Sequence, residues 1–320
     1  MKRIALILSA LVGLSIPSLA GPLIGFDVFD ARSFGLAQTT VANPGVTGGF
    51  QVNPAVLAEC KSMAFSAFFL PWFEDMSFYS ASCVMPLRMI PGRIINAGFS
   101  YTGFGVNKFP NFDETGVRQG EVGASDHLLT VSAGMPVYKM IDVGMSLKLT
   151  ASSLAGIASF TGCLDAGAIA KFYLANPFFK KEVDNLKLGL SVQNLGFPQK
   201  FKSKGSPLPL KFHAGFSYGF LKYAKSDVAF SAEMNAALGQ KLKTAVGLEI
   251  NSDDFLRLRL GYRLSGQSLI GLTAGAGLAF QIKRVRFAFD YALVPLADLG
   301  IQNVLSLSVV LPEAKVRGKE

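Results

Sequence analysis

Five arginines near the end of this sequence have the residue type and the spacing to bind an anion. Each lies on one parity of a stretch in which apolar and other residues alternate; they are Arg257, Arg259, Arg263, Arg284 and Arg286. Every second residue of an extended chain points to the same side, so these guanidinium groups would share one face. A guanidinium holds a carboxylate through two parallel hydrogen bonds, and the pattern therefore predicts an anion-binding strip.

Acidic residues offer a second interpretation of the same arginines. The cations would then only neutralise Glu233, Glu249 or Asp290 inside a packed interior, or line a rim. Lys148 and Lys187, on two other alternating stretches, are further cationic candidates. The sequence leaves both interpretations open.

The element that positions these side chains is an extended strand with one apolar face. Between the arginines of the stretch 255–264 lie Leu256, Leu258, Leu260, Tyr262 and Leu264. The same alternation recurs in about fourteen segments of roughly 8 to 12 residues, from 62–71 to 302–311, which glycine, proline, asparagine or charged turns separate. One parity is apolar and the other is polar or small, which predicts antiparallel strands.

Alternation alone fits a soluble β-sandwich as well as a membrane barrel. The chain is 50% hydrophobic and 17% charged, yet past residue 20 it contains no run of about 18 apolar residues that could form a membrane helix. The predicted connections are mostly short on one side, whereas the two longest, Gly105 to Ser125 and Leu195 to Pro209, share the other side. This asymmetry is typical of outer-membrane barrels. We therefore predict an all-β, transmembrane, antiparallel β-barrel of about 14 strands, with leucines toward lipid and arginines toward the lumen.

Residues 1–20 have the pattern of an export signal. Two basic residues are followed by an apolar run from Ile4 to Ile16, and the small residues Ser18 and Ala20 precede a predicted cleavage site. The apolar run is too short to cross a bilayer as a helix. We expect the exported chain to reside in the cell outer membrane, with its barrel over residues 62–311.

Residues 21–61 form a different kind of segment, because alternation is not sustained there. Asn53 can cap a short helix whose first position is Pro54 and whose second is Ala55. The segment is large enough to fold inside the barrel as a hatch or plug. The alternative is an arm on the periplasmic side.

Several short motifs, in one order along the chain, resemble the FadL-type superfamily of outer-membrane transporters of hydrophobic compounds, which includes PorV-like barrels. Two of them resemble its N-terminal hatch, and the others resemble its barrel strands. They are A-R-S-F-G-L-A from residue 31, N-P-A from 53, D-A-G from 165, L-G-L-S-V-Q-N-L-G from 188, R-L-R-L-G-Y-R from 257 and F-D-Y-A-L-V-P-L-A-D-L-G from 289.

The resemblance implies a fourteen-stranded barrel with a hatch that moves hydrophobic molecules inward. The ligand would be a long-chain fatty acid or a similar compound, with its carboxylate on the arginines and its tail on aromatic residues. Phe34 and Phe50 in the hatch would contact it, or would form the hatch's own core. Asn53, Pro54 and Ala55 would hold the helix start and take part in gating. Outer-membrane lipid and the barrel-assembly machinery would be the other partners.

The sequence leaves two other functions open. A PorV-like barrel would bind a protein through its loops, where Phe109, Pro110 and Phe112 could form an exposed apolar patch. A general porin would need a more open and polar lumen. The chain also departs from the usual pattern of outer-membrane barrels, because it continues past Leu311 as a short polar tail, residues 312–320, instead of ending on an aromatic residue.

Catalytic, metal and nucleic-acid chemistry find no support in the sequence. His127 and His213 are far apart and lack a metal or triad spacing. Cys60, Cys83 and Cys163 show no metal-ligand spacing either. The net charge is +9, but the basic residues are scattered along the strands and form no patch. We expect no enzyme, no cofactor, no metal and no nucleic-acid partner.

Overall fold

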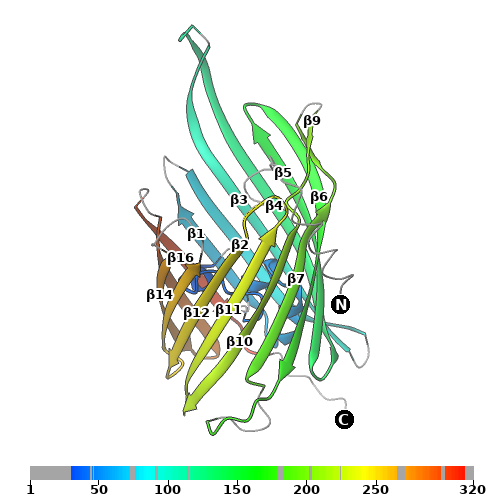
Figure 1. Cartoon of the computed structure of the whole chain (residues 1–320), viewed down its shortest axis with the longest axis vertical. Coiled ribbons are helices and arrows are strands. Elements are labelled where there is room, and N and C mark those ends of the chain that lie inside the picture. The colour runs from blue at the N-terminus through cyan, green and yellow to red at the C-terminus, as the bar shows by residue number, and fades with distance from the viewer. Residues whose placement is uncertain are drawn as a thin grey trace.

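The computed structural model describes residues 30–43, 45, 47–72, 76–90, 93–113, 115–178, 184–201, 204–223, 225–264, 271–296 and 300–313. Within these residues, fourteen antiparallel strands form one sheet, and the first pairs with the last to close it into a barrel (Figure 1). Closure gives the backbone N–H and C=O groups of every strand a partner on a neighbouring strand. The hydrocarbon of a bilayer could not supply such partners to an open edge. The export signal predicted for residues 1–20 and most of the tail predicted for 312–320 lie outside the described residues.

The first half of the barrel consists of β1 (Ala64–Pro71), β2 (Met76–Ile90), β3 (Arg93–Phe112), β4 (Arg118–Tyr138), β5 (Ile141–Leu154), β6 (Ile157–Phe172) and β7 (Leu186–Gly196). The second half consists of β10 (Lys211–Tyr223), β11 (Ser226–Ala237), β12 (Lys243–Ser252), β13 (Leu256–Leu264), β14 (Leu272–Ile282), β15 (Val285–Pro295) and β16 (Ile301–Val310). A separate hairpin, β8 (Gln199–Phe201) and β9 (Lys204–Ser206), lies in the connection between β7 and β10.

The strands run alternately between two rims. The lower rim, at the bottom of Figure 1, carries the short turns β4–β5, β12–β13 and β14–β15 and the end of β16. The upper rim carries the β3–β4 hairpin and the β7–β10 connection. The predicted number, direction and order of the strands are confirmed.

One predicted loop was wrong. Most of the connection expected from Gly105 to Ser125 continues the two strands, because β3 runs to Phe112 and β4 begins at Arg118. The pairing of β3 with β2 ends at Val106, so the tip of the β3–β4 hairpin rises above its neighbours (Figure 1). Shifts in the β3–β4 register past Val106 break the two-residue period there, and the sequence pattern therefore did not extend the strands.

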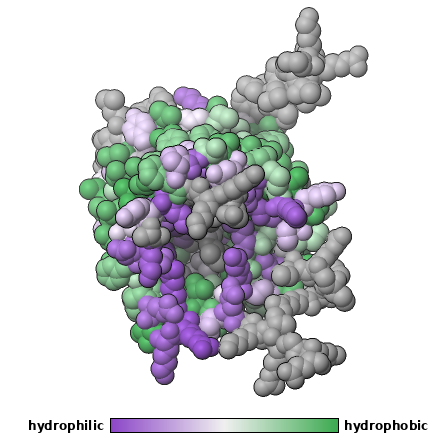
Figure 2. Space-filling view, turned by 90° about the horizontal axis from the view of Figure 1, so that it is seen from below, coloured by the Kyte–Doolittle hydropathy of each residue, from purple (hydrophilic) through white to green (hydrophobic). Residues whose placement is uncertain are grey.

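The outer wall is apolar and much of the inner wall is polar, as predicted for a transmembrane barrel. On β13, Leu258 and Leu260 are 46% and 53% exposed, whereas Arg259 between them is 2% exposed. Figure 2, a view from below, shows hydrophobic residues around much of the outer wall and hydrophilic residues gathered at the lower rim. An alternating wall of this kind lets lipid cover one face while the other holds charges.

Residues 30–60, where described, lie inside the barrel, and we call them the lumenal segment (Figure 1). The segment contains the helix α3 (Ala31–Gly35) and two 3-10 helices, η1 (Gly49–Gln51) and η2 (Pro54–Glu59). Asn53 caps η2 by accepting a hydrogen bond from the Ala55 N–H, and Pro54 is the first helical residue, as predicted. Among the described residues, no helix has the length and the apolar character needed to cross a bilayer.

Glycines on the inner wall let the backbone of the lumenal segment approach closely. A Cβ added at Gly261 would meet the backbone of Leu36 and Ala37, and one added at Gly144 would meet the backbone of Pro54. The wall and the segment are therefore fitted to each other at positions where only glycine leaves room.

Polar side chains of the wall hold the segment's backbone. Gln193 on β7 donates from Nε2 to the carbonyls of Gln51 and Val52, each at 2.9 Å. Asn96 on β3 donates to the carbonyl of Cys60 at 3.0 Å. These bonds satisfy irregular backbone that would otherwise be buried without partners.

Candidate functional site

The inner face of β13 presents four residues to the lumen at successive heights. From the lower rim upward they are Arg257, Arg259, Gly261 and Arg263. The lumenal segment touches this face at Gly261. The three arginines therefore have different surroundings, although the sequence spaces them almost evenly.

Arg259 is part of a buried ion-pair network. Its Nε donates to Glu249 Oε1 at 2.8 Å, and its Nη1 donates to Asp290 Oδ1 at 2.6 Å. Arg32 of the lumenal segment shares Glu249, with Nη2 to Oε2 at 2.6 Å. This geometry corresponds to the neutralising interpretation, so Arg259 ties three strands and the segment together.

Two lysines that the sequence also suggested are ion-paired. Lys148 lies 2.6 Å from Asp165, and both side chains are buried. Lys187 lies 2.7 Å from Glu59 of the lumenal segment. Each of them therefore has a carboxylate of the chain as its partner.

Arg263 borders a cavity above the lumenal segment, which we call the upper cavity. Its volume is about 160 Å³. The lining residues are Ala37, Gln38, Thr40 and Val52 of the segment and His213, Glu233, Asn235, Lys243, Thr244, Ala245 and Arg263 of the wall. Among the described residues, the Arg263 side chain makes no hydrogen bond or ion pair. Its guanidinium is therefore available to a ligand in the cavity.

Glu233, the acidic residue of the upper cavity, is occupied by the lumenal segment. Its Oε2 accepts the backbone N–H groups of Thr40 and Val41 at 2.6 and 2.8 Å. Its Oε1 lies 2.8 Å from His213 Nδ1. These contacts engage both carboxylate oxygens, and among the described residues no ion pair joins Glu233 to Arg263.

Arg257 and Arg286 border a second cavity of about 250 Å³ below the lumenal segment, which we call the lower cavity. Its wall includes the hydroxyl-bearing residues Ser66, Ser306 and Ser308. Arg284 lies in the β14–β15 turn, exposed at the lower rim, and lines neither cavity. The five arginines thus fall into four environments: the upper cavity, the lower cavity, the packed layer between the cavities, and the rim.

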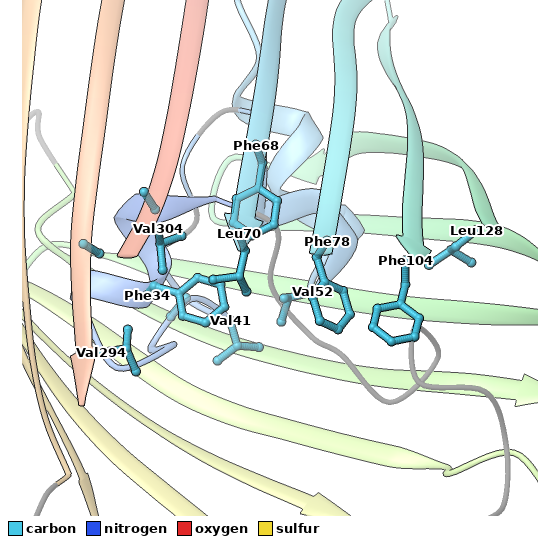
Figure 3. Close-up of a cluster of buried hydrophobic side chains, with 13 residues drawn as sticks. Phe34, Val41, Val52, Phe68, Leu70, Phe78, Phe104, Leu128, Val294 and Val304 are labelled. Atoms are coloured by element: carbon cyan, nitrogen blue, oxygen red, sulfur yellow. The ribbon is translucent and has the colours of Figure 1, made fainter. Parts of the chain in front are cut away.

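Phe34 belongs to an apolar cluster inside the barrel (Figure 3). Its ring lies 6.0 Å from that of Phe68 on β1, and the two rings are stacked. Phe78 on β2 and Phe104 on β3 continue the cluster with ring centres 4.6 Å apart. Trp72, at the upper end of β1, contacts Phe78 edge-on. A packed apolar cluster, which we call the apolar inner surface, therefore runs from the upper rim to the lumenal segment, where it also includes Val41 and Val52.

The other predicted residues of the lumenal segment lie in its contacts with the wall. Phe50 is fully buried in a cluster with Leu57 and Val84, so it forms core. Asn53 Nδ2 donates to the carbonyl of Val41 at 2.8 Å, while its Oδ1 caps η2. Pro54 and Ala55 lie beside them, buried against the inner wall.

Sequence reasoning missed several residues that anchor the segment. Asn96 and His213 were not singled out for this role, although each lies on an inward parity. Arg32, within one of the resembling motifs, proved to be a partner of Glu249. The signal that could have found them is a large polar side chain at an inward position of a lipid-facing strand, since such a group needs a partner.

No protein-family model matches this chain, and no curated protein sequence matches it. Solved structures do match. The toluene transporter TbuX of Ralstonia pickettii aligns with a TM-score of 0.57 at 13% identity, covering 89% of this chain and 97% of that chain. The toluene transporter TodX of Pseudomonas putida gives 0.54 at 12%, covering 89% and 97%. A FadL homologue of Pseudomonas aeruginosa gives 0.53 at 10%, covering 90% and 99%. The resemblance predicted from the motifs is thus confirmed for the fold, and this chain has the fold of the FadL-type outer-membrane barrels.

Proposed function

We propose that this chain is an outer-membrane barrel that passes hydrophobic compounds of about one aromatic ring through its lumen. The observation that carries the proposal is the apolar inner surface, which begins at Trp72 on the upper rim and reaches Phe34, Val41 and Val52 of the lumenal segment. Burial of these side chains stabilises the barrel, and their apolar character also suits the passage of hydrophobic compounds. Val52 also lines the upper cavity, so the apolar surface and the cavity adjoin.

The size of the upper cavity favours a small substrate. An apolar cavity of about 150 Å³ in another protein is known to hold benzene, and the upper cavity measures about 160 Å³. The long-chain fatty acid that the motifs suggested would have to place its tail among rings that already pack together. The similar proteins TbuX and TodX are toluene transporters, which agrees with this size.

Arg263 gives the upper cavity a preference for compounds that carry one negative charge. Its guanidinium has no carboxylate partner among the described residues, and Lys243 lies on the same cavity. An aromatic acid could therefore place its carboxylate on Arg263 and its ring toward Val52. In this proposal the lumenal segment acts as the hatch, and it must shift before a compound passes.

The proposal is tested by uptake into intact Gram-negative host cells that lack their own barrel of this kind. Labelled toluene, benzoate, oleate and a disaccharide are supplied to cells with and without the protein. We expect faster entry of toluene and benzoate, little change for oleate and none for the disaccharide. Equal toluene entry with and without the protein would reject the function.

Two variants sharpen the test. Phe78→Ser places a hydroxyl in the apolar inner surface and should slow toluene entry, whereas Phe160→Ser on the outer wall, at a side chain that is 70% exposed, should not. Arg263→Gln should slow benzoate and spare toluene, and Lys241→Gln, an exposed cation at the upper rim, is its control.

A protein-binding function remains the second candidate, and the β3–β4 hairpin is the observation that favours it. The hairpin rises beyond the pairing with β2, and Phe112 and Val117 at its tip are each 57% exposed. Exposed apolar residues on a projecting element often mark a docking surface. Loss of a secreted protein from the cell surface after shortening the hairpin, with no protein-dependent toluene entry, would support this candidate.

A further inference from the structure

The lower cavity is lined by charged side chains and hydroxyl groups. The passage of neutral hydrocarbons does not require such a lining. It measures about 250 Å³ and lies below the lumenal segment, toward the lower rim. Its charged lining residues are Asp30, Arg32, Arg257, Arg286 and Asp290. Its chemistry is therefore decided by which of these charges are already satisfied.

The two acidic groups and Arg32 are engaged by other parts of the chain. Arg32 donates to Glu249, and Asp290 accepts from Arg259. Asp30 accepts from the backbone N–H and the hydroxyl of Ser33 at 2.7 and 2.8 Å. None of these three is left to attract a ligand.

The two remaining arginines differ from each other. Arg286 donates from Nη2 to the carbonyl of Asp254 at 3.1 Å and lies 3.9 Å from the carboxylate of that residue. Arg257 makes no hydrogen bond or ion pair among the described residues. One half-buried guanidinium thus borders the cavity without an ion pair. Asp290 is close enough to attract it but is already bound to Arg259, so the guanidinium can still gain from binding an anion.

Hydroxyl groups line the opposite side of the same cavity, on β16. Ser306 accepts the backbone N–H of Ala31 at 3.2 Å, so its own O–H is free to donate. Ser308 lines the cavity as well. A carboxylate could therefore accept two bonds from Arg257, while the serine hydroxyls keep the other side of the cavity polar.

The acidic lining residues limit the charge of the ligand. Asp30 and Asp290 border the same space and repel every negative charge on a ligand, so a second charge adds repulsion that Arg257 no longer offsets. The volume exceeds the roughly 150 Å³ that holds benzene elsewhere. A ring with one carboxylate satisfies both conditions, and a dianion does not.

We propose that the lower cavity is a binding site for a small aromatic monocarboxylate, with Arg257 as its anchor, on the opposite side of the lumenal segment from Arg263. The binding itself is independent of transport. Its role as the release side of the pathway rests on the proposed function, because an anion leaving Arg263 would reach Arg257 only after the segment shifts. Arg259, between the two, is held by Glu249 and Asp290 and does not compete for the anion.

The site is tested by titrating benzoate into the purified, detergent-solubilised protein in a calorimeter. The titration uses the Arg263→Gln variant, so that the upper cavity does not contribute. In this background Arg257→Gln should weaken benzoate binding about 10- to 100-fold, the amount expected for lost charged hydrogen bonds. Arg284→Gln removes the same charge from the same rim outside the cavity, and it should leave the affinity unchanged.

Three further measurements test the role of the charge and guard against a folding defect. Arg257→Lys keeps the charge but loses the planar pair of donors, and it should bind with intermediate affinity. Benzyl alcohol and phthalate, the neutral and doubly charged relatives of benzoate, should bind more weakly than benzoate. Circular dichroism must show the same strand content in every variant that is compared.

The outcomes separate this inference from the proposed function. Equal benzoate affinity in Arg257→Gln and Arg284→Gln would overturn the lower site, and so would tighter binding of phthalate than of benzoate. Neutral toluene needs neither arginine, so its uptake tests the transport function alone. Benzoate binding that depends on Arg257, in a protein that admits no toluene, would keep the site and reject the transport.

Discussion

At the scale of single residues, arginines that look alike in the sequence have different partners inside the barrel. Arg259 forms ion pairs with two carboxylates, whereas Arg257 and Arg263 form none among the described residues. The two-residue period predicts correctly which wall face each arginine occupies. The period cannot predict which acidic residue each arginine binds, because such contacts join distant parts of the chain. Glu249, for example, also binds Arg32, which lies 217 residues away.

The network around Arg259 should be a major source of stability. Arg259→Gln leaves Asp290, which is 6% exposed, without its cation. Breaking a buried pair from one side typically costs about 3 to 5 kcal/mol. The free energy of unfolding in urea, measured in lipid vesicles, should fall by an amount of that order.

An exposed ion pair supplies the control for that measurement. Arg118 and Glu121 lie 3.0 Å apart near the hairpin tip, with side chains 58% and 49% exposed. Arg118→Gln should change the free energy of unfolding by no more than about 1 kcal/mol. Similar losses in the two variants would show that burial of the Arg259 network does not matter.

At the scale of elements, the central feature is the fit between the lumenal segment and the inner wall. The start of η2 could be predicted, because Asn53 and Pro54 are local signals for the N-terminus of a helix. The path of the segment could not be predicted, since it depends on wall glycines and on Glu233, Gln193 and Asn96, which are distant in sequence. Local chemistry sets the helix caps, and long-range contacts set the position.

A methyl group on the wall tests this fit directly. In Gly261→Ala the new Cβ meets the backbone of Leu36 and Ala37, which cannot move as a side chain would. Overpacking of this kind costs about 1 to 3 kcal/mol, and we expect the lumenal segment to become easier to cleave by protease. Gly105→Ala, also in a strand but with no atom within 4 Å of the new Cβ, is the matched control. Equal cleavage of the two variants would contradict the close contact.

The tip of the β3–β4 hairpin is expected to respond to acid only at very low pH. The hydroxyl of Thr115, the backbone N–H of Val117 and the amide of Gln119 donate to Asp113, and these bonds lower its pKa to about 2. A depressed folded-state pKa adds stability that is present above the ordinary value and is lost as the pH falls through about 2.

The hairpin-tip prediction can be checked by following the Thr115 and Val117 amide signals by NMR between pH 7 and pH 1. The signals should stay constant to about pH 3 and shift near pH 2. Asp113→Asn should abolish the shift. A midpoint near the ordinary aspartate value would contradict the bonding pattern at the tip.

At the scale of the whole molecule, the barrel separates two chemistries on two faces of one sheet. Leucines such as Leu258 and Leu260 face outward, and the inner face holds ion pairs, glycines and an apolar surface against the lumenal segment. The closed sheet and its strand number could be predicted, because lipid imposes a strict two-residue period. Past Val106, β3 no longer keeps the two-residue period. The sequence therefore predicted a loop where the strand continues. The cavities were beyond prediction, since their shape depends on how the segment folds back.

The central claim is that compounds pass through the lumen only when the lumenal segment moves, and locking the segment tests it most directly. Thr39 Oγ1 of the segment lies 2.7 Å from Ser231 Oγ of β11, so cysteines at both positions can form a disulfide. Ser132 and Ser146, also 2.7 Å apart but both on the wall, provide a control pair. The native Cys60, Cys83 and Cys163 are replaced by serine in both proteins.

Toluene entry into intact cells is then measured before and after reduction of the disulfide. For Thr39→Cys with Ser231→Cys, the account predicts that oxidation lowers entry to that of cells without the protein and that reduction restores it. For Ser132→Cys with Ser146→Cys, entry should be the same in both states. Unchanged entry through the barrel with its segment locked would contradict the account.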